Sequence, residues 1–339
     1  MRRLVLLFVL CAVSLALCAT GAGAGDWRPP PGKLWVVNRD KGEVTIFDAA
    51  TGKWRATIPT GPGAHEVALS RRTRQAYVTN EFEDTLSLIS TRTLAQRKIS
   101  AGPRPHHLEP SGDGRSMLVG LVGANRIAAV DTRTEQVREY VSSANPAARA
   151  HSAYRPRGSD TIYVPHETGD EVTGIDAGTG AIEFSVGGIV QASEVLPDLA
   201  ERLLYVTARG EGKVKVIDIA THAVVREVAV GSQPETLLLT PDGRTLVVSL
   251  RGTPAQIAFV DTGSLTVTAT VPIGGPDTFG DLAALSRDGR YVFATFDRGA
   301  GGTGGVAVVD ACRRQLVRTW DYPGTGRPHG IAYQPQRPR

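Results

Sequence analysis

The sequence predicts an all-β protein, a seven-bladed β-propeller whose blades are four-stranded antiparallel sheets. Three observations indicate this. A short apolar segment recurs seven times, centred at positions 35, 77, 118, 163, 205, 247 and 293, so the spacing is 41 to 46 residues. Each copy is followed by further segments that alternate apolar and polar residues between Gly, Asp, Asn and Pro turns. No amphipathic helical pattern follows residue 25. Units of this length with four short strands are typical of propeller blades.

The second strand of each blade is the most regular element of the repeat. Its copies read LWVVN (34–38), AYVTN (76–80), MLVGL (117–121), IYVPH (162–166), LYVTA (204–208), LVVSL (246–250) and VFATF (292–296). A polar turn leads to a third strand, such as VTIFD (44–48) or VKVID (214–218), which ends near an aspartate in six copies. The fourth strand runs through segments such as KWRATIPTG (53–61), and the first strand of the next blade follows, as in HEVALS (65–70).

The two chain ends predict how the ring closes. The first copy begins with a second-type strand at 34–38, whereas the last segment, HGIAYQP (329–335), is a solitary first-type strand. We therefore expect the C-terminal strand to complete the blade that the N-terminal strands begin, which removes a free sheet edge. Residues 34–335 then form one propeller domain behind an extended lead-in over 25–33.

The first 24 residues predict a secretory signal peptide. Arg2 and Arg3 precede an apolar run from Leu4 to Leu17 and then small residues. We expect cleavage after Ala24 and a secreted or periplasmic product. The apolar run is shorter than the roughly 20 residues of a membrane span, so no transmembrane segment is expected. A lipid anchor at Cys18 is not expected either, because the bulky Leu17 precedes it.

Charge gives no sign of a nucleic-acid partner. Without Arg2 and Arg3, 36 of the 38 Lys and Arg remain against 34 Asp and Glu, a net charge of +2. Basic residues such as Arg71, Arg72 and Arg74 occupy a turn and are not interleaved with aromatic residues.

The repeats resemble a known family. LYVTA and AYVTN, with the trailing VIDIATH and TPDGR, are similar to the YVTN-type seven-bladed β-propeller family over essentially the whole chain after the signal peptide. The resemblance implies the architecture and not one activity, since similar propellers include lactonases, lyases and copper or haem oxidoreductases.

Four of the seven histidines occupy one position of the repeat, the start of the first strand. The first strand is the innermost of a propeller blade, so these residues should converge on one mouth of the central channel. One residue further along, Glu66, His107 and Glu194 should flank this column, and His166 should open onto the same face. Because four consecutive blades carry the histidines, we expect one arc of imidazoles. The column reads His65, His106, His151, Ser193, Glu235, Asp281 and His329.

Two classes of function remain open at this point. The first is a secreted scaffold without enzymatic activity that binds a protein, glycan or small-molecule ligand at the mouth. Its candidate ligand-binding residues are His65, His106, His107, His151, His166, His329, Glu66, Glu194, Glu235 and Asp281. The second is a Cu- or Zn-dependent oxidoreductase, lyase or hydrolase, or a metal carrier, with His65, His106, His151 and His329 as ligands, because neutral imidazole suits these metals. Whether His106 or His107 faces the channel depends on a one-residue register.

Overall fold

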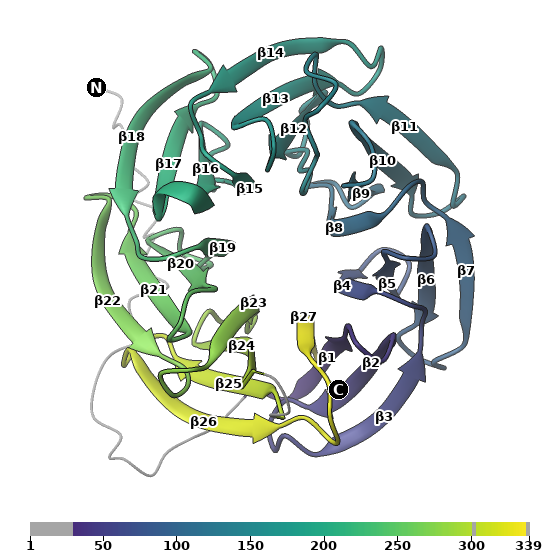
Figure 1. Ribbon diagram of the computed structural model, residues 1–339, viewed down its shortest axis with the longest axis vertical. Coiled ribbons are helices and arrows are strands. Elements are labelled where there is room, and N and C mark those ends of the chain that lie inside the picture. Colours follow the sequence, from purple (N-terminus) through teal and green to yellow (C-terminus); the bar gives the residue numbers. More distant parts are fainter. Residues whose placement is uncertain (1–29, 300–302, 337–339) are drawn as a thin grey trace, which may run out of the picture.

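The computed structural model describes residues 30–299 and 303–336 and confirms the seven-bladed ring (Figure 1). The expected signal peptide (1–24), Cys18 and most of the lead-in lie outside the described residues. Within the described ranges, the strands form seven antiparallel sheets arranged around a central channel. None of the helices in these ranges has the length and hydropathy that a membrane span needs.

The blades repeat one strand order from the channel outward. The innermost strands are β27 (Pro328–Pro335), β4 (Ala64–Ser70), β8 (Pro105–Pro110), β15 (Ala192–Pro197), β19 (Pro234–Leu239) and β23 (Phe279–Leu285). The second strands are β1 (Gly32–Asn38), β5 (Gln75–Asn80), β9 (Ser116–Leu121), β12 (Thr161–His166), β16 (Leu203–Ala208), β20 (Thr245–Leu250) and β24 (Tyr291–Asp297). The third strands are β2 (Glu43–Asp48), β6 (Thr85–Ser90), β10 (Arg126–Asp131), β13 (Glu171–Asp176), β17 (Lys213–Asp218), β21 (Gln256–Asp261) and β25 (Gly305–Asp310). The outermost are β3 (Trp54–Pro59), β7 (Gln96–Ser100), β11 (Val137–Val141), β14 (Ile182–Gly187), β18 (Ala223–Ala229), β22 (Thr266–Pro272) and β26 (Gln315–Asp321).

One blade departs from this pattern. The sheet of β12, β13 and β14 has three strands, and its innermost place is taken by a segment that makes two isolated bridges, Ala150 to His166 and Tyr154 to Tyr163. His151 lies in this segment, so the repeat position that the sequence predicts is kept without a full strand. A single turn of 3-10 helix, Arg209–Glu211, follows β16.

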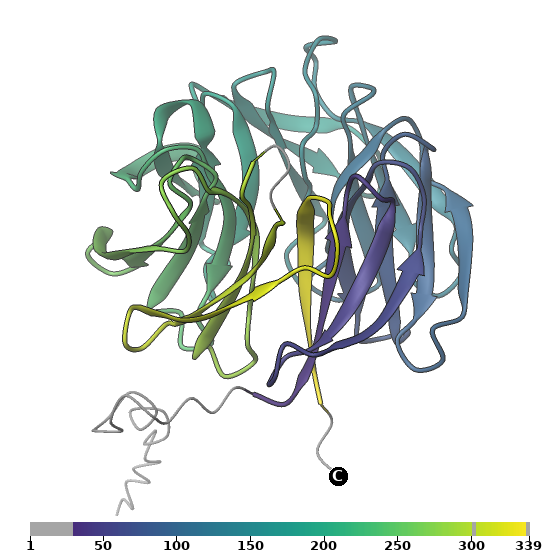
Figure 2. The same ribbon diagram turned by 60° about the horizontal axis from the view of Figure 1, so that its bottom comes forward.

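The ring closes as the chain ends predict. β27 pairs antiparallel with β1, with Gly32 opposite Pro335 and Trp35 opposite Ala332. The indole nitrogen of Trp35 donates to Gln334 Oε1 over 2.9 Å. Figure 2 shows β1 beginning and β27 ending at the same end of the ring. The N-terminal blade therefore has no unpaired inner edge.

The apolar core lies between neighbouring blades. The second and third strands of each blade are buried, whereas the outermost strands are largely exposed. One cluster joins Leu34 and Val36 of the first blade to Phe293 and Val308 of the last. The seven apolar segments of the repeat thus supply the inter-blade packing, and the same packing holds the start of each inner strand at the channel mouth.

Candidate binding site at the channel mouth

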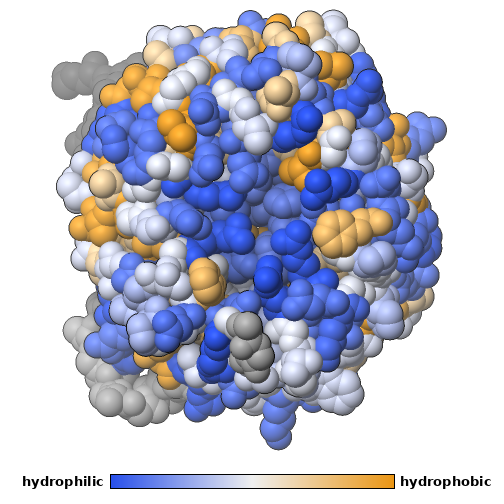
Figure 3. Space-filling model, viewed as in Figure 1, coloured by the Kyte–Doolittle hydropathy of each residue, from blue (hydrophilic) through white to orange (hydrophobic). Residues whose placement is uncertain are grey.

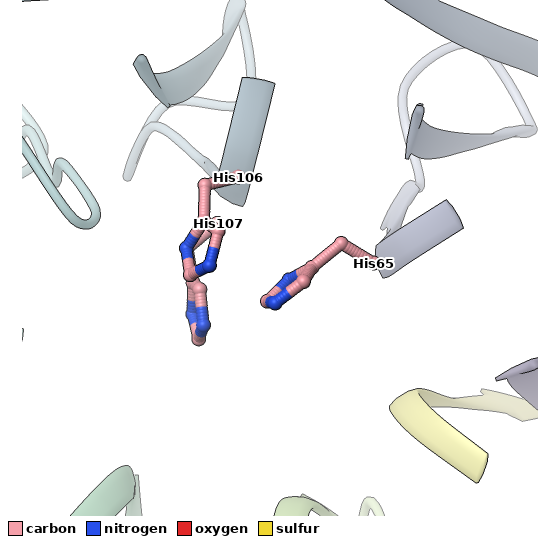
Figure 4. A group of neighbouring side chains, drawn as sticks. All are labelled: His65, His106 and His107. Carbon is pink, nitrogen blue, oxygen red and sulfur yellow. The ribbon is translucent and has the colours of Figure 1, made fainter. Parts of the chain in front are cut away.

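A β-bulge recurs where each inner strand begins. Pairing of β8 with β9 jumps from Pro105 opposite Leu121 to Leu108 opposite Val119, which leaves one extra residue on β8. The same shift occurs in β4, β15, β19, β23 and the β27–β1 pair. A bulge interrupts the side-chain alternation of a strand. Two consecutive residues can therefore reach the channel, and His106 and His107 both do. Figure 4 shows both side chains leaving β8 toward His65 of β4.

Five imidazoles gather at this mouth. The ring centroid of His65 lies 3.7 Å from that of His106 and 3.9 Å from that of His329. His151 lies 4.7 Å from His106 and 4.2 Å from His107. Four of the five are almost fully buried, at 1 or 2 % exposure, and only His106 is partly exposed. The structure thus brings together the four histidines of the repeat position and adds His107. We call these five residues the histidine cluster.

Two carboxylates and two arginines border the histidine cluster. Glu235, 1 % exposed, lies with its Oε2 3.1 Å from Arg209 Nε and 3.6 Å from Arg251 Nη1. Arg251 Nε also lies 3.4 Å from Asp281 Oδ1, and Asp281 Oδ2 lies 3.1 Å from His329 Nε2. Hydrophilic residues accordingly surround the centre of this face in Figure 3.

The carboxyl groups of Glu235 and Asp281 have opposite pKa shifts. Burial alone would raise the pKa of Glu235, but Arg209 and Arg251 outweigh it, and the pKa lies below its usual value. Burial raises the pKa of Asp281 to about 6, against the attraction of Arg251. Glu235 is therefore the firmly ionised acid of the site.

The imidazoles are neutral near pH 7. Burial, followed by the neighbouring imidazoles, holds the pKa of His65 and of His106 well below 6.5. Burial lowers the pKa of His107 to about 4, although Glu235 opposes the shift. Burial also lowers the pKa of His151 and His329. Neutral imidazole is the form that coordinates metal ions.

Hydrogen bonds fix the tautomer of His151. Its Nδ1 lies 2.8 Å from the carbonyl oxygen of Ser193 and donates to it, so the lone pair is on Nε2. Arg209 Nη2 donates to that nitrogen over 3.0 Å. The coordinating nitrogen of His151 is thus already engaged by a cation.

Two groups of potential metal ligands share His107. One is His65, His106 and His107, and the other is His107, His151 and Glu235; in each, one ligand atom per residue lies within 4.8 Å of the others. In the first group His65 Nδ1, His106 Nδ1 and His107 Nε2 are buried and have no hydrogen-bond partner among the described residues. In the second group Arg209 and Arg251 contact the ligand atoms. The first group is the better donor set for a cation.

Glu66 and Glu194 link neighbouring blades. The Leu108 amide of the next inner strand donates to Glu66 Oε2 over 2.8 Å, and that of Leu237 donates in the same way to Glu194. Glu66 Oε2 also lies 3.3 Å from His107 Nδ1. Burial raises the pKa of both carboxyl groups well above the usual value. Glu66 therefore contacts the histidine cluster directly, whereas Glu194 links neighbouring inner strands.

His166 does not join the histidine cluster. It ends β12, is fully buried, and its Nε2 lies 3.2 Å from the Ser142 carbonyl oxygen and 3.1 Å from Thr173 Oγ1. These partners belong to the packing between two blades. The end of a second strand is thus a different environment from the start of an inner strand.

Sequence reasoning missed Arg251 and Glu109. Arg251 comes directly after the second strand β20, just as Arg209 comes directly after the second strand β16. An arginine at this position of two neighbouring repeats could therefore have been recognised in the sequence. Glu109 lies two residues beyond His107 on β8, and burial raises its pKa to about 7.

The fold and this site define a seven-bladed β-propeller with a buried histidine cluster at one channel mouth. The chain belongs to the YNCE-like β-propeller family, whose model matches residues 5–339 and bears out the resemblance read from the repeats.

Individual relatives are distant. Antigen Lp49 of Leptospira interrogans is 23% identical over 65% of this chain and 53% of its own length. A protein called YncE of Salmonella typhi is 24% identical over 61% of this chain and 48% of its own. The chain thus spans about half the length of these curated relatives. Among solved structures, dihydro-heme d1 dehydrogenase NirN superposes with a TM-score of 0.63 at 18% identity, over 90% of this chain and 75% of its own, a likeness of fold.

Proposed function

We propose that this chain is an extracytoplasmic binding propeller that holds one Cu²⁺ or Zn²⁺ ion at its channel mouth. His65, His106 and His107 are the protein ligands in this proposal. The observation that carries it is the approach of one ring nitrogen from each residue to within 4.8 Å of the others, in a buried setting.

Protonation and contacts favour these three residues. Metal–imidazole bonds of about 2.0–2.1 Å place ligand nitrogens at most about 4.2 Å apart, so small side-chain rotations bring the three nitrogens to an ion. All three rings have lowered pKa values and need not lose a proton to bind. An ion beside His151 and Glu235 would instead have to displace Arg209.

The surroundings support the same ion position. Glu66 Oε2 lies 3.3 Å from His107 Nδ1, so a side-chain oxygen faces one ring nitrogen and leaves the other, Nε2, for an ion, as partners of metal-binding imidazoles do. His106 is partly exposed, which leaves a side open to the channel mouth. A further ligand atom from a bound small molecule or partner would enter there, so the scaffold recognises its ligand through the ion. Nitrogen donors of this kind bind Cu²⁺ more tightly than Zn²⁺.

Metal content and titration test the proposal. The protein is expressed without a histidine tag, its metal content is measured by mass spectrometry, and Cu²⁺ and Zn²⁺ are titrated calorimetrically. We expect one ion per chain and a loss of affinity of at least about 100-fold in the His106→Gln/His107→Gln variant, because changes outside the ligand set already cost 10- to 100-fold. The control is His222→Asn, since His222 is exposed and stacks on Phe184, away from the mouth.

A second variant separates the two ligand groups. His151→Gln should change the affinity by less than about tenfold, because Arg209 already occupies its Nε2. No ion above background, or equal binding by all variants, would refute the metal proposal and leave the mouth as a metal-free surface for ligands or partners.

A further inference from the structure

A large cavity lies at the opposite end of the propeller from the histidine cluster. It has a volume of about 1010 Å³ and is lined by the start of β1, the end of β27, the ends of β2 and β4, and the turns after them. Figure 2 shows these strand ends together at the lower end of the ring. A volume of this size is at the upper end of the range for small-molecule sites.

The cavity is strongly cationic. Six cations line it and Asp48 is the one lining acid. Arg55 pairs with Asp48 over 2.7 Å. The other five cations make no ion pair with an acid within residues 30–299 and 303–336. Asp288, beside Arg287, accepts hydrogen bonds from Ser286 and from the Arg290 amide. The five unpaired cations are Lys33, Arg71, Arg74, Arg92 and Arg287.

These five cations come from four separate segments. Lys33 is on β1, Arg71 and Arg74 are on the turn between β4 and β5, Arg92 is on the turn between β6 and β7, and Arg287 is on the turn between β23 and β24. Like charges brought together by the fold repel one another unless an anion lies between them. Their position around one cavity gives it a positive potential that would attract an anion with more than one negative charge.

One wall of the cavity is apolar. Ile46, Ala56, Leu69, Leu94 and Tyr333 line it beside the cations. Tyr333 is held in place because its hydroxyl donates to the Pro31 carbonyl oxygen over 3.2 Å and its ring stacks on Phe293. Inorganic phosphate would leave this wall unused.

We infer that this cavity binds a phosphate monoester that carries an apolar or aromatic group. Guanidinium groups match phosphate oxygens in pairs, and a phosphate monoester carries close to two charges at neutral pH. The ester group lies among Arg71, Arg92 and Lys33, and the apolar part lies against Leu69 and Tyr333. The site is independent of the proposed metal site.

Calorimetry with two phosphates and sedimentation with lipid vesicles test this inference. Inorganic phosphate and 1-naphthyl phosphate are titrated into the full chain, and sedimentation with vesicles of phosphatidylcholine that contain phosphatidic acid, itself a phosphate monoester, measures binding to lipid headgroups. We expect one naphthyl phosphate per chain, bound at least about tenfold more tightly than inorganic phosphate because the ring buries apolar surface. If the protein binds the vesicles and naphthyl phosphate competes with that binding, the natural ligand is a lipid headgroup. If the protein does not bind the vesicles, the natural ligand is a soluble phosphate ester.

Two variants locate the site. Arg71→Gln/Arg92→Gln should weaken naphthyl phosphate binding at least about tenfold, because two charge-assisted contacts are lost. Both residues are exposed and have no ion pair within the described residues, so the variant should fold, and an unchanged Tm in thermal unfolding checks that. The matched control is Arg133→Gln, on the equivalent turn of the next blade and outside the cavity. Equal weakening in the control, or no binding of either phosphate to the unmodified protein, would overturn the inference.

Discussion

Neutralising Glu235 should destabilise the propeller by about 3 kcal/mol. Glu235 is 1 % exposed and lies 3.1 Å from Arg209 and 3.6 Å from Arg251. Each attraction is worth about 5 kcal/mol at an effective dielectric constant of about 20. Glu235→Gln loses both attractions but also removes the cost of burying a carboxylate. Each arginine also keeps one acidic partner: Arg209 lies 3.0 Å from Glu167, and Arg251 lies 3.4 Å from Asp281. The remainder, about 3 kcal/mol, is at the low end for breaking a buried ion pair.

Thermal and urea unfolding measure this loss. At roughly 2 °C per kcal/mol for a domain of this size, the Tm should fall by about 6 °C. The difference should persist in 1 M NaCl, because salt screens buried pairs poorly. The control is Glu227→Gln, which removes an exposed pair with Lys213 at 2.6 Å and should cost less than about 1 kcal/mol. A loss below about 1 kcal/mol for Glu235→Gln as well would refute the assignment of Glu235 as the firmly ionised acid.

Three further outcomes are expected. Burial lowers the pKa of His166 to about 4, so as the pH falls below 6.5 this imidazole is protonated in the unfolded chain before it is protonated in the folded one, and the free energy of unfolding decreases. In urea unfolding, His166→Gln should reduce the decrease between pH 6.5 and pH 5 by about 2 kcal/mol. An equal decrease in the variant and the unmodified protein would contradict this. Gly120→Ala places a Cβ 2.3 Å from the His151 carbonyl oxygen and should cost about 2 kcal/mol, whereas Gly187→Ala, with open space around it, should not destabilise; equal stabilities would count against the packing argument. Protein recovered from the extracytoplasmic fraction should begin at Gly25 by intact mass, and a retained N-terminus would exclude cleavage after Ala24.

Most of the fold could be predicted from the repeat, because each blade has the same sequence pattern of strands and turns. Leu34, Tyr77 and Leu246 lie where the pattern predicts, in buried second strands. Ring closure was also predictable, since the C-terminal segment lacks a partner in its own repeat.

The channel mouth was predictable in composition but not in contacts. Simple alternation allows only one of His106 and His107 to face the channel, and the bulge between Pro105 and Leu108 admits both. No residue type marks the bulge in these strands, so the bulge could not be predicted from the sequence. The cationic cavity was hidden for another reason: Lys33, Arg71 and Arg287 are far apart in the chain and line one cavity only when the first, second and last blades pack together.

Pairing of β27 with β1 makes the histidine cluster depend on the meeting of the two ends of the propeller. The contact between Trp35 and Gln334 joins residues 299 positions apart, whereas blade-to-blade contacts such as that of Glu66 with Leu108 span 42. Closing the longer loop costs only about 1.7 kcal/mol more, since each doubling of length adds about 0.6 kcal/mol. His329, at the start of β27, reaches His65 only after this closure. A chain cut short by its final strand would have six intact blades, an open first blade and an incomplete cluster.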